Sequence, residues 1–164
     1  KCNAIVDRNL IDKLYEASCA GVRIEIIARG ICCLRPGIDG LSENITVRSI
    51  VGRYLEHGRV YAFANGGRFG SPKNTVFMSS ADLMPRNLLR RVEMFVQLEN
   101  PTVRKQVINQ ILTALLQDER NSWFLMPDGS YRHPETGPDS FSAHDYFIAN
   151  PSLSGAGSLA KETK

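Results

Sequence analysis

The stretch YLEHGRVYAFANGG, residues 54–67, contains the only histidine of the first 132 residues, His57, two positions before Arg59. A histidine side chain has an unperturbed pKa of about 6.5, so it can exchange a proton at neutral pH, and its neutral form can attack phosphorus. A guanidinium nearby can bind the oxygens of the same phosphoryl group. The spacing therefore points to phosphoryl chemistry. The alternative is a surface histidine that pairs with Glu56.

Arginines are concentrated in the middle of the chain. Residues 23–91 hold eleven basic and five acidic residues, whereas the whole chain has a net charge of +3. Arginine makes paired bonds to phosphate oxygens that lysine cannot make. The pattern favours an anionic partner, which could be a phosphate, a nucleotide or a nucleic acid. From charge alone, a solvated basic face without a ligand remains the alternative.

Composition narrows the class of protein. The four cysteines show no CxxC spacing and only three histidines accompany them, so neither a zinc site nor a disulfide framework is indicated. No run of about 18 apolar residues and no secretory signal is present, which predicts a cytoplasmic protein. The chain begins with KCNAIVD, which resembles a strand already under way. We therefore expect one domain cut from a longer polypeptide.

Periodicity and turn residues predict the elements that must position His57. A helix is expected at 9–20, with Asp7 as its cap and Gly21 past its end, and a second helix begins at Pro101 and carries an apolar stripe to Leu116. Strands are expected at 22–28, 45–51, 59–64, 75–80 and 91–98. The fold class is therefore α/β, with a mixed β-sheet flanked by helices.

Three loops at strand ends carry the polar residues that could form a site. They span 29–44, 55–59 and 79–87, and ligands commonly bind at such carboxyl edges. Their candidate side chains are Arg29, Arg35, His57, Arg59, Ser79, Ser80, Asp82, Arg86 and Asn87. Convergence of the loops would create a phosphate site with a titratable imidazole. We interpret His133, His144 and Asp82 as structural, and no acidic cluster is sufficient to hold a metal ion.

A local motif supports the phosphate interpretation. His57-x-Arg59 followed by SSAD at 79–82 resembles a variant of the phospholipase-D signature, in which histidine, a cation and a Ser/Asn turn surround a phosphoryl group. The sequence departs from that signature at three places. Arg59 replaces the usual lysine, Ala64 stands where the signature has an acid, and SSAD is only similar to the Gly-Ser-x-Asn turn.

A longer stretch carries a more specific resemblance. Residues 3–67 together with VFMSSADLMPRNLLRRVEM, residues 76–94, closely resemble the C-terminal part of bacterial polyphosphate kinase, which extends inorganic polyphosphate from ATP. The resemblance covers residues 1–116, and DGSY at 128–131 resembles the closing segment of the family. It implies a phospholipase-D-like catalytic domain at 1–120, the second of two such C-terminal domains. A closing segment at 121–149 and a disordered tail at 150–164 would follow.

The resemblance also implies roles for individual residues. His57 would be the catalytic histidine, acting as a general acid/base or orienting the phosphoryl group, and Arg29 and His57 would contact the phosphates of ATP. Arg59 and Arg86 are further candidates for binding ATP or polyphosphate. The phosphohistidine of the family lies in the preceding domain, so this chain alone should be inactive. Mg²⁺ is expected, with ligands outside this chain.

The implied partners are ATP, ADP, inorganic polyphosphate and the remaining domains of the same polypeptide, without nucleic acid. A homo-oligomer and peripheral membrane association of the full enzyme are compatible with the resemblance. Two other functions stay open. One is a phospholipase-D-type phosphodiesterase in which His57 is the nucleophile, and the other is a non-catalytic phosphate- or nucleic-acid-binding module.

Overall fold

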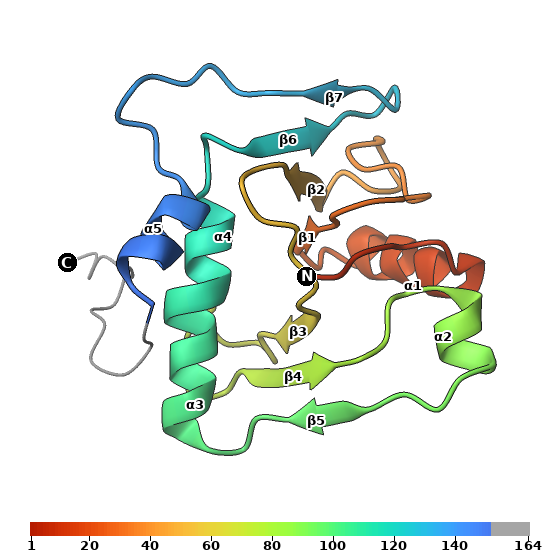
Figure 1. Cartoon of the computed structure of the whole chain (residues 1–164). Coiled ribbons are helices and arrows are strands. Elements are labelled where there is room, and N and C mark those ends of the chain that lie inside the picture. Colours follow the sequence, from red (N-terminus) through yellow and green to blue (C-terminus); the bar gives the residue numbers. More distant parts are fainter. Residues whose placement is uncertain (152–164) are drawn as a thin grey trace.

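The computed structural model describes residues 1–151, which form both strands and helices (Figure 1). The strands are β1 Ile24–Ile27, β2 Ile45–Ile50, β3 Val60–Phe63, β4 Thr75–Ser79, β5 Phe95–Gln97, β6 Ser122–Leu125 and β7 Tyr131–Arg132. The helices are α1 Arg8–Cys19, α2 Pro85–Leu89, α3 Pro101–Gln106, the π-helix η1 Val107–Leu112, α4 Thr113–Gln117 and α5 Ala143–Ala149.

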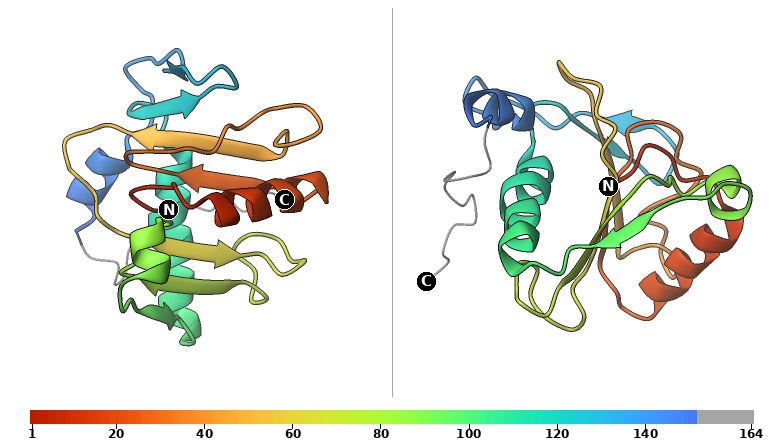
Figure 2. Two further views of the ribbon diagram at one scale, coloured as in Figure 1. Left: turned by 90° about the vertical axis from the view of Figure 1, so that its right-hand side faces the viewer. Right: turned by 60° about the horizontal axis from the view of Figure 1, so that its bottom comes forward.

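The strands form two hydrogen-bonded sheets. One has the order β1-β2-β6-β7 and the other β3-β4-β5. β1 and β2 are parallel, with Ile24 opposite Ile45, whereas every other pair is antiparallel. Helices lie on both faces of these sheets, with α1 on one side and α3, η1 and α4 on the other (Figure 2). The predicted α/β class with a mixed sheet flanked by helices is confirmed.

The N-terminal segment, residues 1–6, lies between the two sheets and joins them (Figures 1 and 2). On one side Cys2 N donates to the carbonyl of Ile27 at 3.0 Å, and Cys2 forms a parallel bridge with Ala28. On the other side Leu83 N donates to the Ala4 carbonyl at 3.1 Å. The apolar run at the start of the sequence therefore acts as a short central strand.

Local signals account for the two longest helical segments. Asp7 caps α1, because its Oδ1 accepts a hydrogen bond from Leu10 N at 2.9 Å. The helix expected from Pro101 is continuous through η1 and α4, and Asn100 caps its start. Within it, Thr113 N reaches the Ile108 carbonyl five residues back, which is the hydrogen-bond pattern of a π-helix.

Apolar side chains from both faces of the sheets form the core. Ile5, Ile11 and Leu34 belong to the cluster beneath α1. On the opposite face, Leu115 of α4 packs with Ile50 of β2, and Ile108 of η1 packs with Val76 of β4. The N-terminal segment thus contributes to the core as well as to the backbone hydrogen bonds.

The chain beyond Arg120 is more regular than its composition indicates. β6 pairs with β2, with Trp123 opposite Ser49, and Ala143 at the start of α5 is buried against Leu115. Of the tail expected at 150–164, residues 152–164 lie outside the described residues. None of the helices between residues 1 and 151 combines the length and the apolar character that a bilayer crossing requires.

Candidate phosphate-binding site around His57

Arg29 and His57 form the centre of the site. Arg29 lies two residues past the end of β1, and its backbone is held by Cys2 O and by Ser49 Oγ, at 3.2 and 3.1 Å. Its guanidinium Nη1 lies 3.3 Å from both ring nitrogens of His57. His57 is exposed and Arg29 is half-buried. An anion in solvent can therefore reach the imidazole and the guanidinium together.

Arg59 is held by a buried carboxylate. Its Nε and Nη2 donate to the two oxygens of Asp82 at 3.2 and 2.9 Å, and its Nη1 donates to the carbonyl of His57 at 3.1 Å. Burial alone would raise the pKa of Asp82, but hydrogen bonds from Arg59 and from Asn3 N outweigh it and lower that pKa. The bond to Asp82 raises the pKa of Arg59 in turn. Arg59 therefore fixes the backbone at His57.

The third predicted loop is organised around Glu93. Ser80 Oγ donates to Glu93 Oε2, and Asn87 Nδ2 donates to Oε1 at 2.6 Å. These bonds lower the pKa of Glu93. Only Phe95–Gln97 of the expected strand 91–98 is extended in a ladder, since Glu93 and Met94 instead bind Ser80. Sequence reasoning missed Glu93, because an isolated acid in a basic stretch carries no distinctive spacing.

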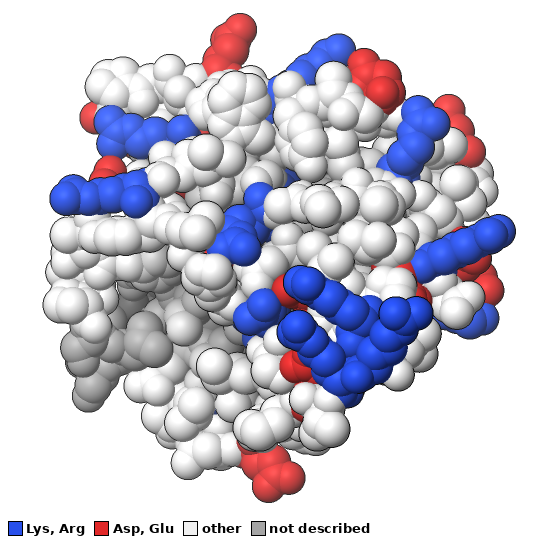
Figure 3. All heavy atoms as spheres, turned by 45° about the vertical axis from the view of Figure 1, so that its right-hand side comes forward, with Lys and Arg blue, Asp and Glu red and all other residues white. Residues whose placement is uncertain are grey.

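Two predicted arginines lie apart from the Arg29–His57 pair. Arg35 donates through Nε to the carbonyl of Pro127 at 3.0 Å, which ties its loop to the turn before β7. Arg86 lies on α2, is exposed, and its side chain makes no hydrogen bond or ion pair with another residue of 1–151. Figure 3 shows Lys and Arg side chains gathered in a dense group on the side that carries α2, and Arg90 and Arg91 follow the helix.

A shallow hollow of about 300 Å³ lies beside Arg29. Its walls are Arg29, Gly30, Ser49, Val51, Trp123 and Tyr131. Trp123 stands opposite Ser49 in the β2–β6 ladder, and this pairing places Trp123 in the wall of the same hollow as Arg29. Trp123 and Tyr131 were not among the predicted site residues, because nothing in the sequence after Arg120 shows which strand would lie next to β2.

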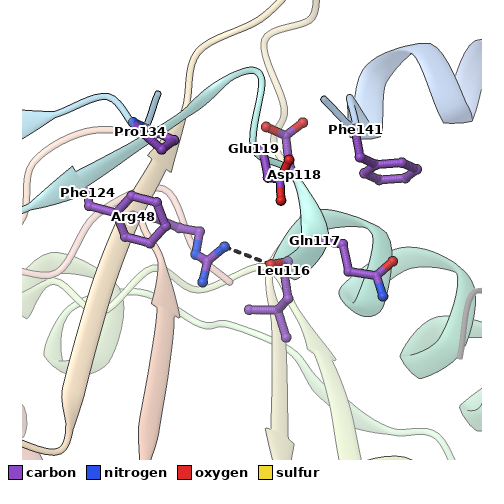
Figure 4. Close-up of a pocket in the computed structure, with 8 residues that line it drawn as sticks. All are labelled: Arg48, Leu116, Gln117, Asp118, Glu119, Phe124, Pro134 and Phe141. Atoms are coloured by element: carbon purple, nitrogen blue, oxygen red, sulfur yellow. Dashed lines mark hydrogen bonds between the residues drawn. The ribbon is translucent and has the colours of Figure 1, made fainter. Parts of the chain in front are cut away.

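A larger cavity of about 670 Å³ contains none of the predicted site residues (Figure 4). Arg48 lies over the ring of Phe124, 4.7 Å from its centroid, and donates to the carbonyl of Leu116 at 2.7 Å. Desolvation lowers the pKa of Arg48. These contacts bind the end of α4 to β2, so Arg48 has a structural role here.

The described acids do not fit a Mg²⁺ site. Among residues 1–151, no three His, Cys, Asp or Glu side chains are placed to hold a metal ion. Both oxygens of Asp82 are occupied by Arg59 and Asn3 N, and both oxygens of Glu93 by Ser80 and Asn87.

The structure joins the three predicted loops through specific contacts. Arg29 reaches His57, and Arg59 links the His57 backbone to Asp82. The result is an exposed imidazole beside one guanidinium, with a second guanidinium fixing the backbone beneath. Such a site can bind phosphate oxygens and supply or accept a proton.

Known proteins provide an independent comparison. Residues 1–144 match the family model described as polyphosphate kinase C-terminal domain 2. The chain is 57% identical over 157 residues to polyphosphate kinase of Erythrobacter litoralis, covering 96% of this chain and 22% of that protein. It is 48% identical over 151 residues to polyphosphate kinase of Synechocystis, covering 91% of this chain and 20% of that protein.

A solved structure gives the same answer. The crystal structure of polyphosphate kinase from Porphyromonas gingivalis matches with a TM-score of 0.83 and 35% identity, covering 94% of this chain and 23% of that one. The chain thus spans about a fifth of the length of the curated relatives it matches. The extent of the family match and these identities establish that this chain belongs to the family of the second C-terminal domain of polyphosphate kinase.

Proposed function

We propose that this chain is the part of an ATP:polyphosphate phosphotransferase that holds the transferred phosphoryl group, in a reversible reaction between ATP and inorganic polyphosphate. The observation that carries the proposal is the contact between Arg29 and His57, two residues 28 positions apart that meet at an exposed edge. The resemblance to polyphosphate kinase implies that the same two residues contact the phosphates of ATP. The family membership supports ATP and polyphosphate as the substrates.

Phosphoryl transfer requires positioning and charge stabilisation more than covalent chemistry from the protein. Arg29 would donate two N–H groups to oxygens of the γ-phosphate, in place of its present contact with His57. The unphosphorylated histidine of the preceding domain would attack the γ-phosphorus as the bond to the bridging oxygen of ADP breaks, which makes it the phosphohistidine and releases ADP. A terminal oxygen of polyphosphate would then take the phosphoryl group from that histidine. His57 would donate a hydrogen bond or a proton to the phosphoryl oxygens.

Arg59 and Arg86 receive different parts in this proposal. The bonds of Arg59 to Asp82 leave it a positioning role at His57, with any phosphate contact secondary. Arg86 is exposed and lies with Arg90 and Arg91 on a basic surface, so it would attract the anionic polyphosphate chain. Magnesium would be held by residues outside this chain.

The organisation of the whole enzyme belongs to the same proposal. The bonds of β6 to β2 and the packing of α5 on α4 support treating 1–120 and the closing segment 121–149 as one unit. We expect the 164-residue chain alone to form no polyphosphate. Contact with the remaining domains, a cytoplasmic location, and oligomerisation or peripheral membrane association of the full enzyme also remain predictions.

The decisive experiment incubates the full-length enzyme with γ-labelled ATP and measures long-chain polyphosphate. His57→Ala should lower synthesis by a factor on the order of 10²–10⁴, the usual effect of losing a positioned acid/base group. In the wild-type enzyme, acid-labile label should map to a peptide that precedes this chain.

Other outcomes identify the other functions. Label on the peptide containing His57 would make His57 the nucleophile and contradict the assigned roles. Release of a head group or nucleotide without polyphosphate would identify a phosphodiesterase. Polyphosphate formed by the 164-residue chain alone would contradict the expected need for the preceding domain.

A further inference from the structure

His144 is buried against the loop that carries His57. We call residues 51–59, between β2 and β3, the His57 loop. His144 lies on α5, nearly 90 residues away in sequence, and only 2% of its surface is exposed. Its Nε2 lies 2.8 Å from Oε1 of Glu56, the residue before His57. A buried histidine that binds the residue next to His57 is placed to influence the position of His57.

Both ring nitrogens of His144 have partners, and one tautomer satisfies both. Tyr54 N is a donor 3.4 Å from Nδ1, so Nδ1 must accept. The proton then lies on Nε2, which donates to the carboxylate of Glu56. A single ring thus ties two points of the His57 loop to α5. The edge of the Tyr54 ring adds a contact, with centroids 5.5 Å apart.

The backbone of the loop is shaped around this imidazole. A Cβ on Gly52 would stand 2.4 Å from His144 Nδ1 and 2.9 Å from Cε1, distances that real Cβ atoms do not adopt. Only glycine therefore lets the loop lie directly on the ring. This close approach does not involve Glu56, so it is a second, independent observation that the His57 loop packs on His144.

The position of α5 is itself fixed by a buried acid. Asp118, 1% exposed, follows α4, and its Oδ2 accepts from Ala143 N at 2.7 Å. On the other side of the loop, Lys1 Nζ lies 3.0 Å from Oε2 of Glu56. Glu56 is therefore held from both sides, by His144 of α5 and by the N-terminal segment.

We propose that His144 is a positioning residue for the phosphoryl-transfer reaction, which acts through Glu56 to hold His57 in place. The inference rests on the proposed function of His57. It does not make His144 a catalytic residue, because nothing brings the buried ring to the substrate. Misplacement of a reacting group by about 1 Å can cost about 10²-fold in rate. Loss of the anchor should therefore affect turnover more than substrate affinity.

The test compares two amides at position 144 in the full-length enzyme. In His144→Gln the amide nitrogen stands near the place of Nε2 and can still donate to Glu56, whereas in His144→Asn it is too short to do so. We expect His144→Asn to lower kcat roughly 10- to 100-fold with little change in KM for ATP, and His144→Gln to restore most of the loss. Asp145 lies on the same helix as His144, and Asp145→Asn removes an exposed ion pair with Arg120. This variant is the matched control and should change neither value.

Two further measurements separate positioning from simple destabilisation. In a His57→Ala background, His144→Asn should cost little more, because the residue it positions is gone. Equal losses in both backgrounds would overturn the inference. Hydrogen exchange of the His57 loop, measured without substrate, should speed up in His144→Asn while α1 is unchanged. Unchanged loop exchange would also overturn the inference, whereas full activity of His57→Ala would overturn the proposed function and leave the exchange result standing.

Discussion

Arg29 and Arg59 lie beside the same histidine but are held by different partners. Arg29 contacts an exposed imidazole and not a carboxylate, so a phosphate can compete for its guanidinium. Arg59 binds Asp82, which is 4% exposed, and separating that pair would leave a buried charge. At the scale of single residues, availability for a ligand therefore depends on the partner that must be given up.

This difference predicts the effect of Arg29→Lys in the full-length enzyme. Charge is kept, but an ammonium cannot bridge two phosphate oxygens as the guanidinium fork can. We expect kcat/KM for ATP to fall by roughly 10-fold or more, corresponding to about 1.4 kcal/mol. Steady-state kinetics with ATP and polyphosphate measures the change. Arg35→Lys, at a guanidinium bound to a backbone carbonyl, is the control, and unchanged kinetics for Arg29→Lys would make Arg29 a surface cation.

The Arg59–Asp82 pair predicts a pH-dependent stability. Because the folded state lowers the pKa of Asp82, the carboxylate stabilises the fold above its ordinary pKa of about 4, and this contribution is lost as pH falls through the lowered value. Asp82→Asn should therefore reduce the free energy of unfolding by about 1–3 kcal/mol at pH 7. The difference from wild type should shrink toward pH 3.

Urea unfolding of both proteins at pH 7, 5 and 3 measures that difference. Asp145→Asn, at an exposed pair, should change stability by less than about 1 kcal/mol at each pH. A cost of Asp82→Asn that is the same at all three values would show that the charge of Asp82 is not what stabilises the fold.

The sequence predicted His57 and Arg29 as site residues, and the structure brings them into contact, but the network behind them was not predicted. Both residues follow from their places at strand ends and from the family resemblance. The partner of Glu56 was not predicted. The sequence offered its neighbour His57 as a partner, but the structure pairs Glu56 with His144 on α5. A contact over such a separation depends on the packing of α5, and no local pattern in the sequence encodes it.

At the scale of elements, helices with caps and periodicity in their own sequence were predicted well. Elements that depend on contacts with distant segments were not. α1 and the helix that starts at Pro101 have caps and apolar periodicity within their own sequence. β6, β7 and α5 lie in a stretch rich in Pro, Gly and Ser, and β6 exists because it pairs with β2, more than seventy residues earlier. The apolar stripe from Pro101 to Leu116 predicted a regular helix and did not indicate the π-helical turn at η1.

The cap of α1 gives a prediction at this scale. Asp7 is buried and accepts from Leu10 N, so Asp7→Ala leaves that donor unsatisfied and should lower the free energy of unfolding by about 1 kcal/mol. Asp12→Ala, which removes an exposed contact with Arg8 at 3.9 Å, should cost much less. Thermal or urea unfolding compares the two, and equal effects would contradict the capping role.

At the scale of the whole molecule, the N-terminal segment links the two sheets. Its backbone bonds reach Ile27 of β1 on one side and Val60 of β3 on the other, so residues 1–6 connect β1 to the β3-β4-β5 sheet. The Arg29–His57 pair spans the same junction, because Arg29 follows β1 and His57 precedes β3. The site therefore depends on the docking of residues 1–6, a non-local arrangement that the apolar start of the sequence only hinted at.

Cys2 reports on that docking, because it lies in the segment and is only 2% exposed. Burial raises the pKa of its thiol to about 11, so at pH 8 the reactive thiolate is scarce as well as shielded. Cys19 and Cys33 are exposed in the same chain and serve as internal controls.

Brief treatment of the native protein with a thiol reagent at pH 8, followed by peptide mass spectrometry, should label both controls while Cys2 reacts at least about 100-fold more slowly. In urea, where the segment is released, the rate at Cys2 should rise to that of the controls. Labelling of Cys2 at the rate of Cys19 in the native protein would mean that residues 1–6 are not held between the sheets, and the connection that brings Arg29 to His57 would have to come from elsewhere.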